Sequence, residues 1–264
     1  MARATDEKIR RGREGSGGAV TALLISGLGA GDFDAVVATA KKSGIEGQAV
    51  VARDRAALLR AAGSRWNLVQ NLRLLYRALS SYEVNRAAVV CTPCQAHFLR
   101  QAIHFPIVES CDWSGRVALI VGLFCMGTFS QPSFAAFLRD RFGIRPEQVE
   151  EVFLQGEHLR VRVKGQATPL EIPVLETGEF VNLGCLVCDD YAACDADLSA
   201  GTAPAAPGWT VLIPRTKAGE SALRKGVESG ALEVSPAPEE VRKQVCAKAE
   251  EKLRRAAKYR LLLF

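Results

Sequence analysis

The sequence lacks a long hydrophobic run. Its longest apolar stretch, residues 117–126, has ten residues, whereas a membrane-spanning helix needs about 20. The first residues are polar and charged rather than apolar, so no secretory signal is predicted. Together these absences predict a cytoplasmic protein, in a compartment where thiols stay reduced.

The features of a nucleic-acid-binding protein are also missing. The chain has 34 basic and 29 acidic residues, a modest net charge of +5, with no basic stripe interleaved with aromatics and no recognisable binding motif. Basic residues cluster only near the two ends, and we interpret both clusters as solvated faces or as contacts between subunits. They are Lys8, Arg10, Arg11 and Arg13 at the start, and Lys252, Arg254, Arg255, Lys258 and Arg260 near the end.

Histidine is scarce, which limits acid–base chemistry. The three histidines, His97, His104 and His158, form no convincing catalytic set, and we interpret them as surface or packing residues. The chain has no internal repeat, and the glycines at 27–31 do not form a dinucleotide fingerprint because they follow a predicted helix and precede a strand. No side chain is therefore predicted to act as a catalytic acid or base.

The hydrophobic pattern predicts an α/β fold: a mixed sheet with helices on both faces, an antiparallel β-hairpin region and a Cys-rich loop. Continuous apolar runs at 87–91 and 117–123 are typical of strands covered on both faces, whereas the alternation at 151–174 favours a hairpin. Residues 182–208 are predicted to be a loop. We predict a core at 1–150, a hairpin and cluster-loop region at 151–235 packed on it, and a C-terminal helix at 236–264.

Eight cysteines remain, and in a reducing compartment their short spacings favour metal binding over disulfides. Two Cys-x-x-Cys pairs are present, Cys91/Cys94 and Cys185/Cys188, and Cys125 follows a predicted strand. The ends of parallel strands lie at one edge of a sheet, where these cysteines could meet. Spacing alone leaves three hypotheses open: an iron–sulfur cluster, a structural zinc site, and redox pairs or core thiols.

A glycine-rich loop precedes the first long helix. Gly15, Ser16, Gly17 and Gly18 suit a phosphate group, because their backbone amides can approach an oxyanion at a helix N-terminus. Thr21 adds a hydroxyl, and the nearby arginines could neutralise charge. The alternative is a flexible turn with a helix cap.

Taken together, these motifs resemble the beta-subunit family of coenzyme F420-reducing hydrogenases and formate dehydrogenases. Seven segments match in the family's order, and they cover most of the chain. They are GSGGAVTALL (15–24), FDAVV (33–37), GSRWNLV (63–69), AVVCTPCQ (88–95), GLFCMG (122–127), CLVCDDYAACDADLSAG (185–201) and GWTVLIPRTKAGE (208–220).

The resemblance implies an FAD-containing subunit with one 4Fe–4S cluster, held by Cys94, Cys125, Cys185 and Cys188. It implies that the glycine loop contacts FAD. Less directly, it implies that five later residues lie near the flavin or the cluster: Asp197, Ser199, Gly201, Trp209 and Thr216.

The implied function is electron transfer between a hydride carrier (coenzyme F420 or NAD(P)H) or ferredoxin and the redox partner subunits of a hydrogenase, dehydrogenase or reductase complex. Two alternatives stay open: a flavin and iron–sulfur reductase of an organic substrate, and a zinc-bound, non-catalytic scaffold subunit.

The sequence departs from the family's pattern in its extra cysteines. Cys91 stands where the family usually has glycine, and Cys111, Cys194 and Cys246 are additional. One hypothesis makes them ligands of a second cluster, and the other makes them small buried hydrophobes. Many relatives also begin with a ferredoxin-like module that this chain lacks, so the resemblance implies that neighbouring subunits supply that part of the electron relay.

Overall fold

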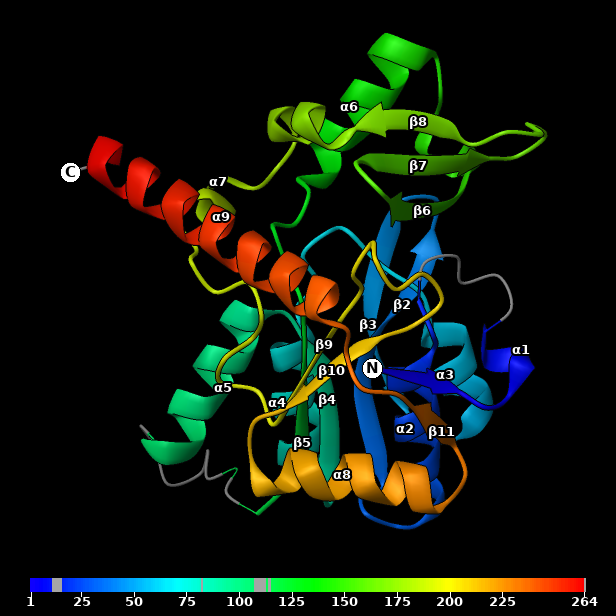
Figure 1. Cartoon of the computed structure of the whole chain (residues 1–264), viewed down its shortest axis with the longest axis vertical. Coiled ribbons are helices and arrows are strands. Elements are labelled where there is room, and N and C mark those ends of the chain that lie inside the picture. The colour runs from blue at the N-terminus through cyan, green and yellow to red at the C-terminus, as the bar shows by residue number, and fades with distance from the viewer. Residues whose placement is uncertain (11–15, 82, 107–112, 114, 264) are drawn as a thin grey trace.

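Six strands form the central sheet (Figure 1). The structure is a computed structural model that describes residues 1–10, 16–81, 83–106, 113 and 115–263. The strands β2 (Ala35–Ser43), β4 (Ala87–Cys91), β5 (Val117–Leu123) and β9 (Leu198–Gly201) run parallel. At one edge, β3 (Glu46–Ala52) pairs antiparallel with β2, and at the other edge, β10 (Val211–Pro214) pairs antiparallel with β9. The strand order is therefore β10-β9-β5-β4-β2-β3.

Helices cover both faces of this sheet because its parallel strands are apolar on both sides. Along β2, Val36 and Ala38 point to one face, and Ala35 and Val37 point to the other. The first face is covered by α2 (Ala19–Gly29), α3 (Arg55–Ala61) and α8 (Lys217–Glu228). The second is covered by α4 (Asn71–Ser80) and α5 (Pro93–His104).

A second, smaller antiparallel sheet lies beside the central sheet (Figure 1). It has its own hydrophobic core. It consists of β6 (Val149–Gln155), β7 (His158–Val163) and β8 (Leu170–Pro173), with α6 (Gln131–Phe142) packed on it. Alternating inward residues of β7 meet a cluster of phenylalanine rings, in which Phe180 contacts Phe129, Phe134 and Phe137 at centroid distances of 4.7–4.8 Å.

The remaining elements are short, apart from the last helix. β1 (Ala2–Ala4) pairs antiparallel with β11 (Leu232–Val234). The helix α9 (Glu239–Leu263) runs past the short helix α7 (Leu183–Leu186) in Figure 1. The others are α1 (Glu7–Arg10) and the 3-10 helices η2 (Pro146–Gln148) and η3 (Val174–Glu179). Within the described residues, no helix combines the length and apolar character that crossing a membrane requires.

The predicted fold class is confirmed: a mixed sheet with helices on both faces and an antiparallel hairpin region. One prediction about the elements is wrong. The segment 182–208 is not entirely loop, because it contains β9, a central strand that pairs parallel with β5. Its four residues, LSAG, have little β-propensity of their own, and the pairing with neighbouring strands determines their conformation.

Candidate functional site

Two cysteines lie at the carboxyl edge of the central sheet. Cys94 is the second residue of α5, directly after β4, and Cys125 follows β5. β4 and β5 are parallel neighbours that pair Cys91 with Gly122, so the chain leaves both strands at the same edge. A capping box between Thr92 and Gln95 fixes the start of α5 and with it the position of Cys94. The side chain of Cys94 is exposed, and that of Cys125 is half-buried.

The second Cys-x-x-Cys pair lies on and just after α7. Cys185 is held by Thr128: the Thr128 amide donates to its Sγ at 3.4 Å, and the Thr128 hydroxyl lies at the same distance. Asn182 in turn donates to the hydroxyl of Thr128 at 2.8 Å. The Sγ of Cys188 lies 3.9 Å from the carbonyl oxygen of Asp190. Thr128 and Asn182 are therefore supporting residues that the sequence analysis missed, although Thr128 directly follows the matched GLFCMG segment.

The environment of Cys125 favours its neutral thiol. Burial raises its pKa to about 11, and smaller electrostatic contributions from Cys185 and Cys94 act in the same direction. The ammonium of Lys252 and the backbone N–H of Gly127 act in the opposite direction. The backbone brings these segments together: β4 and β5 leave Cys94 and Cys125 at the same sheet edge, and Thr128, three residues after Cys125, contacts the sulfur of Cys185. These three cysteines therefore lie in one neighbourhood, and Cys188 is three residues beyond Cys185 on the same loop.

The extra cysteines do not join this neighbourhood as a set. Cys91 is 2% exposed and packs in the apolar core between β4 and α5, where burial strongly raises its pKa. Cys194 and Cys246 are exposed, and Cys111 lies outside the described residues. Among the residues described, no three His, Cys, Asp or Glu side chains are grouped to hold a single metal ion.

The predicted glycine loop packs against its own chain. Gly15 lies outside the described residues, and Gly18 caps α2 in a left-handed conformation with φ of 67°. A Cβ on Gly17 would lie 2.8 Å from the Cβ of Arg3 and 2.9 Å from the carbonyl oxygens of Ala2 and Gly208. Gly17 is therefore required by close packing, so a bulky substitution there would disturb the fold and would not isolate a role in binding flavin.

Asp197 lies at the centre of a hydrogen-bond network between the sheet and two helices. Its side chain accepts from the backbone amide of Ile120 at 2.8 Å, the guanidinium of Arg100 at 2.8 Å and the hydroxyl of Thr216 at 2.7 Å. Thr216 is also the N-cap of α8, where it accepts from the amide of Gly219. Asp197 and Thr216 thus bind other parts of the protein, and no sequence motif pointed to the participation of Arg100.

Ser199, Gly201 and Trp209, which were predicted near the flavin or cluster, also contact the protein itself. Ser199 is fully buried; it donates to the carbonyl oxygen of Ala193 at 3.0 Å and accepts from Arg215 at 2.6 Å. Gly201 lies directly against the Phe124 ring, which a Cβ would overlap. Trp209 stacks under the guanidinium of Arg3, 4.6 Å from the ring centroid.

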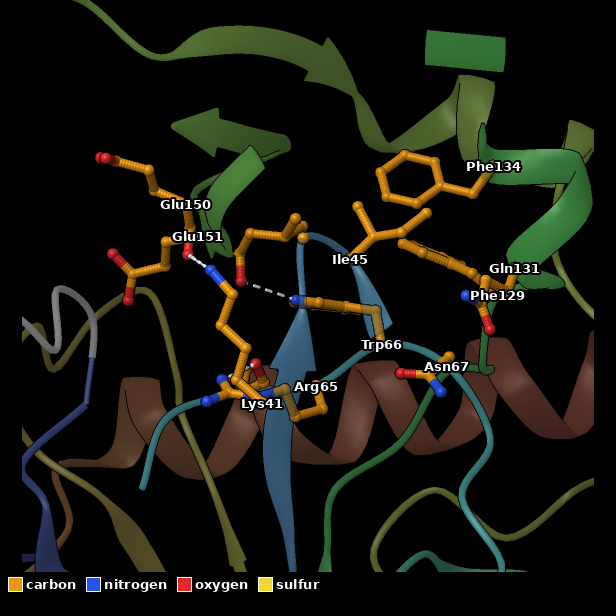
Figure 2. A pocket seen from close by; sticks show the side chains of 13 residues that line it. Lys41, Ile45, Arg65, Trp66, Asn67, Phe129, Gln131, Phe134, Glu150 and Glu151 are labelled. Carbon is orange, nitrogen blue, oxygen red and sulfur yellow. Dashed lines mark hydrogen bonds between the residues drawn. The ribbon is translucent and has the colours of Figure 1, made fainter. Parts of the chain in front are cut away.

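A pocket lies between the two sheets, and no cysteine is among the residues that line it (Figure 2). Trp66, from the matched segment 63–69, donates to the carbonyl oxygen of Val152 at 2.8 Å and stacks on Phe129 at 5.4 Å. Lys41 donates to the carbonyl oxygen of Glu150 at 2.5 Å. Lys41 thus joins β2 to the antiparallel sheet, and Trp66 joins the segment 63–69 to it. Both contacts connect the central sheet with the smaller core.

Comparison with known proteins first places the chain in a class, the subunits of redox enzyme complexes. Two family models for "Coenzyme F420 hydrogenase/dehydrogenase, beta subunit" match in succession, that of the N-terminal part over residues 1–76 and that of the C-terminal part over residues 84–240. The chain belongs to this coenzyme F420 hydrogenase/dehydrogenase beta-subunit family, as its motifs predicted. Its membership supports, in general terms, a role as part of an oxidoreductase.

Individual relatives support the same family assignment. The coenzyme F420 hydrogenase subunit beta of Methanothermobacter thermautotrophicus is 32% identical over 239 residues, which are 90% of this chain and 84% of the relative. That of Methanosarcina barkeri is 30% identical over 90% and 81% of the two chains. A chain of the F420-reducing [NiFe] hydrogenase complex from Methanosarcina barkeri superposes with a TM-score of 0.90 at 28% identity, covering 98% of this chain and 89% of that one.

Proposed function

We propose that this protein is the electron-transfer subunit of a redox complex, and that Cys94, Cys125, Cys185 and Cys188 hold one 4Fe–4S cluster at the carboxyl edge of the sheet. The observation that carries the proposal is that the backbone brings three separate cysteine-bearing segments together: the parallel strands β4 and β5 end at one sheet edge, and Thr128, which follows β5, contacts the Cys185 sulfur at 3.4 Å. Thiolates are the usual ligands of such clusters. Cys188, on the same loop as Cys185, is the fourth.

Two details of the site fit an iron–sulfur cluster. The N–H of Thr128 donates to the Cys185 sulfur, and hydrogen bonds to cluster sulfurs are one of the factors that set a cluster's potential. The Nε of Arg255, whose guanidinium binds the carbonyl oxygens of Met126 and Cys185, is a buried donor without a partner among the described atoms. A sulfur-rich anionic group nearby would supply an acceptor.

A structural zinc site is the alternative for the same residues, since four thiolates are also a common zinc ligand set. Metal analysis of the purified protein distinguishes the two.

We further propose that the chain binds FAD and exchanges electrons with coenzyme F420 or another hydride carrier. The support comes from relatives named for coenzyme F420 and from the glycine loop at the start of α2. When bound, the flavin would exchange hydride for single electrons, and the cluster would carry single electrons onward. The network around Asp197 would support this region from within, rather than contact the flavin.

Anaerobic purification followed by iron, zinc and flavin analysis tests the proposal. The unmodified protein should contain about four irons per chain and FAD. Cys188→Ser should lose the iron, while Cys246→Ser, at an exposed cysteine on α9, should keep it. Stoichiometric zinc without iron would contradict the cluster, and iron without flavin would contradict the proposed FAD site alone.

A reductase complex is a second candidate for the partner. The coenzyme F420-dependent sulfite reductase of Methanocaldococcus jannaschii is 28% identical over 80% of this chain, although the match covers only 34% of that protein. Identification of the subunits that co-purify with the chain distinguishes a hydrogenase or dehydrogenase from a reductase. Reduction of the bound flavin by reduced F420, but not by NADH, would identify the carrier.

A further inference from the structure

The inner face of α9 carries cations against the two cysteine-bearing loops. Lys252 is only 1% exposed, and it donates to the carbonyl oxygens of Cys125 at 2.7 Å and Asp190 at 2.6 Å. One turn further on, Arg255 donates to the carbonyl oxygens of Met126 at 2.5 Å and Cys185 at 3.1 Å. Each of these side chains therefore joins the segment after β5 to the segment around α7.

The burial of Lys252 calls for a nearby negative charge. An ammonium group is costly to remove from water unless it is hydrogen-bonded and paired. Its two acceptors are neutral carbonyls, and in the described part of the chain no carboxylate forms an ion pair with it. Further along α9, the exposed Arg260 does have one, since it pairs with Asp189 at 2.9 Å.

An anionic cluster on the cysteines would supply the charge that Lys252 lacks. The ammonium of Lys252 binds the backbone carbonyl of Cys125 itself, so it lies beside a residue proposed to hold the cluster. Four thiolates around an iron–sulfur core form an anionic assembly, and its reduction adds one more negative charge. A fixed cation at this position would therefore stabilise the reduced form more than the oxidised form.

We propose that Lys252 and Arg255 are positioning residues for the cluster: they hold its two ligand loops together through backbone carbonyls and raise its reduction potential. The inference rests on the proposed iron–sulfur function and extends it to a helix that lies almost entirely beyond residue 240, where the family models end. Neither residue needs to contact iron.

Glutamine substitutions separate charge from hydrogen bonding. Lys252→Gln keeps N–H donors but removes the charge, Lys252→Arg keeps the charge, and Arg255→Gln tests the second cation. Lys258→Gln, at an exposed lysine on the same helix, is the matched control. Each protein is purified anaerobically and analysed for iron, and the midpoint potential of its cluster is measured by a redox titration followed by EPR.

We expect Lys252→Gln and Arg255→Gln each to favour the oxidised cluster by about tenfold, a potential about 59 mV lower for a one-electron couple. Lys252→Arg and Lys258→Gln should stay at the wild-type potential. A merely structural role would change iron content or stability but leave the potential of the remaining clusters unchanged. If Lys252→Gln does not fold, the midpoint potential of Arg255→Gln, at a less buried residue, provides the test.

The outcomes distinguish the cluster itself from the role of α9. A wild-type protein without iron would refute the proposed cluster and this inference with it. A wild-type protein with iron, in which both glutamine variants retain the wild-type potential, would refute only the role of α9.

Discussion

Replacement of Asp197 by Asn tests whether this residue stabilises the fold or contacts a flavin. The carboxylate is 8% exposed and accepts from Arg100, Thr216 and the amide of Ile120. Asparagine has the same shape but no charge, and its NH₂ group would face one of these donors. Hydrogen bonds to charged groups contribute about 1.5–3 kcal/mol each, and breaking a buried ion pair costs about 3–5 kcal/mol. We therefore expect a loss of about 3 kcal/mol.

The neighbouring Asp195 provides a matched control. Its carboxylate is 38% exposed and pairs with the exposed His97 at 2.7 Å, so Asp195→Asn should cost less than about 1 kcal/mol. Both variants are compared with wild type by urea unfolding followed by circular dichroism, with the cofactor content measured for each. In thermal unfolding, Asp197→Asn should lower Tm by roughly 6–12 °C. Equal stability of the two variants would refute the structural role, and selective loss of flavin at unchanged stability would restore the contact predicted from sequence.

Two further predictions concern packing and pH. A Cβ on Gly219 would overlap the carbonyl oxygen of Asp197, so Gly219→Ala should destabilise the protein by at least about 3 kcal/mol. The control is Gly29→Ala in α2, where the added Cβ would meet no neighbouring atom within 4 Å, so this change should be neutral or stabilise the protein by up to about 1 kcal/mol. If the two variants had equal unfolding free energies, the close packing of α8 at Gly219 would be contradicted. Burial raises the pKa of Tyr191 to about 12, so the folded state favours the neutral phenol, and this stabilisation is lost as pH rises from about 10 to about 12, by at most about 3 kcal/mol. Tyr191→Phe should lose less stability than wild type over this range, and an equally steep loss would contradict the burial of the phenol.

The sequence predicted those parts of the fold whose pattern is local. The apolar runs of β4 and β5 and the alternation of β7 identify strands because each side chain faces a defined layer. β9 escaped prediction because its small residues carry no such pattern, and its conformation depends on the strands on either side. The pairing of β1 with β11 escaped for a related reason: three residues at the start of the chain meet three residues more than 200 positions later.

The candidate site also has a part that the sequence could predict and a part that it could not. Cysteines at the ends of adjacent parallel strands are brought to one edge by topology alone, so the neighbourhood of Cys94 and Cys125 could be anticipated. Asp197 and Thr216 lie in two of the matched segments, but sequence cannot tell whether a polar side chain faces a ligand or other parts of the chain. In the structure, both side chains form hydrogen bonds within the protein. Asp197 accepts from Arg100 and from the amide of Ile120, and Thr216 accepts from the amide of Gly219.

The basic C-terminal helix shows why a charge pattern can mislead. Basic residues on a helix normally face water, and Arg254 and Lys258 do so. Lys252 instead lies on the buried face, in the row that includes Val241 and Ala256. The interpretation of this cluster as a solvated face was therefore wrong for Lys252.

The physical reason lies in what α9 packs against. Helix amphipathicity predicts burial correctly when the partner surface is apolar, as it is for Val241 near β10. Further along, the partner surface consists of the two cysteine-bearing loops, whose carbonyl oxygens have no partners in a sheet or long helix. A lysine or arginine on the facing side of the helix satisfies these acceptors, and an apolar side chain would leave them without hydrogen bonds. The buried face of α9 is thus apolar where it meets the sheet and cationic where it meets the loops.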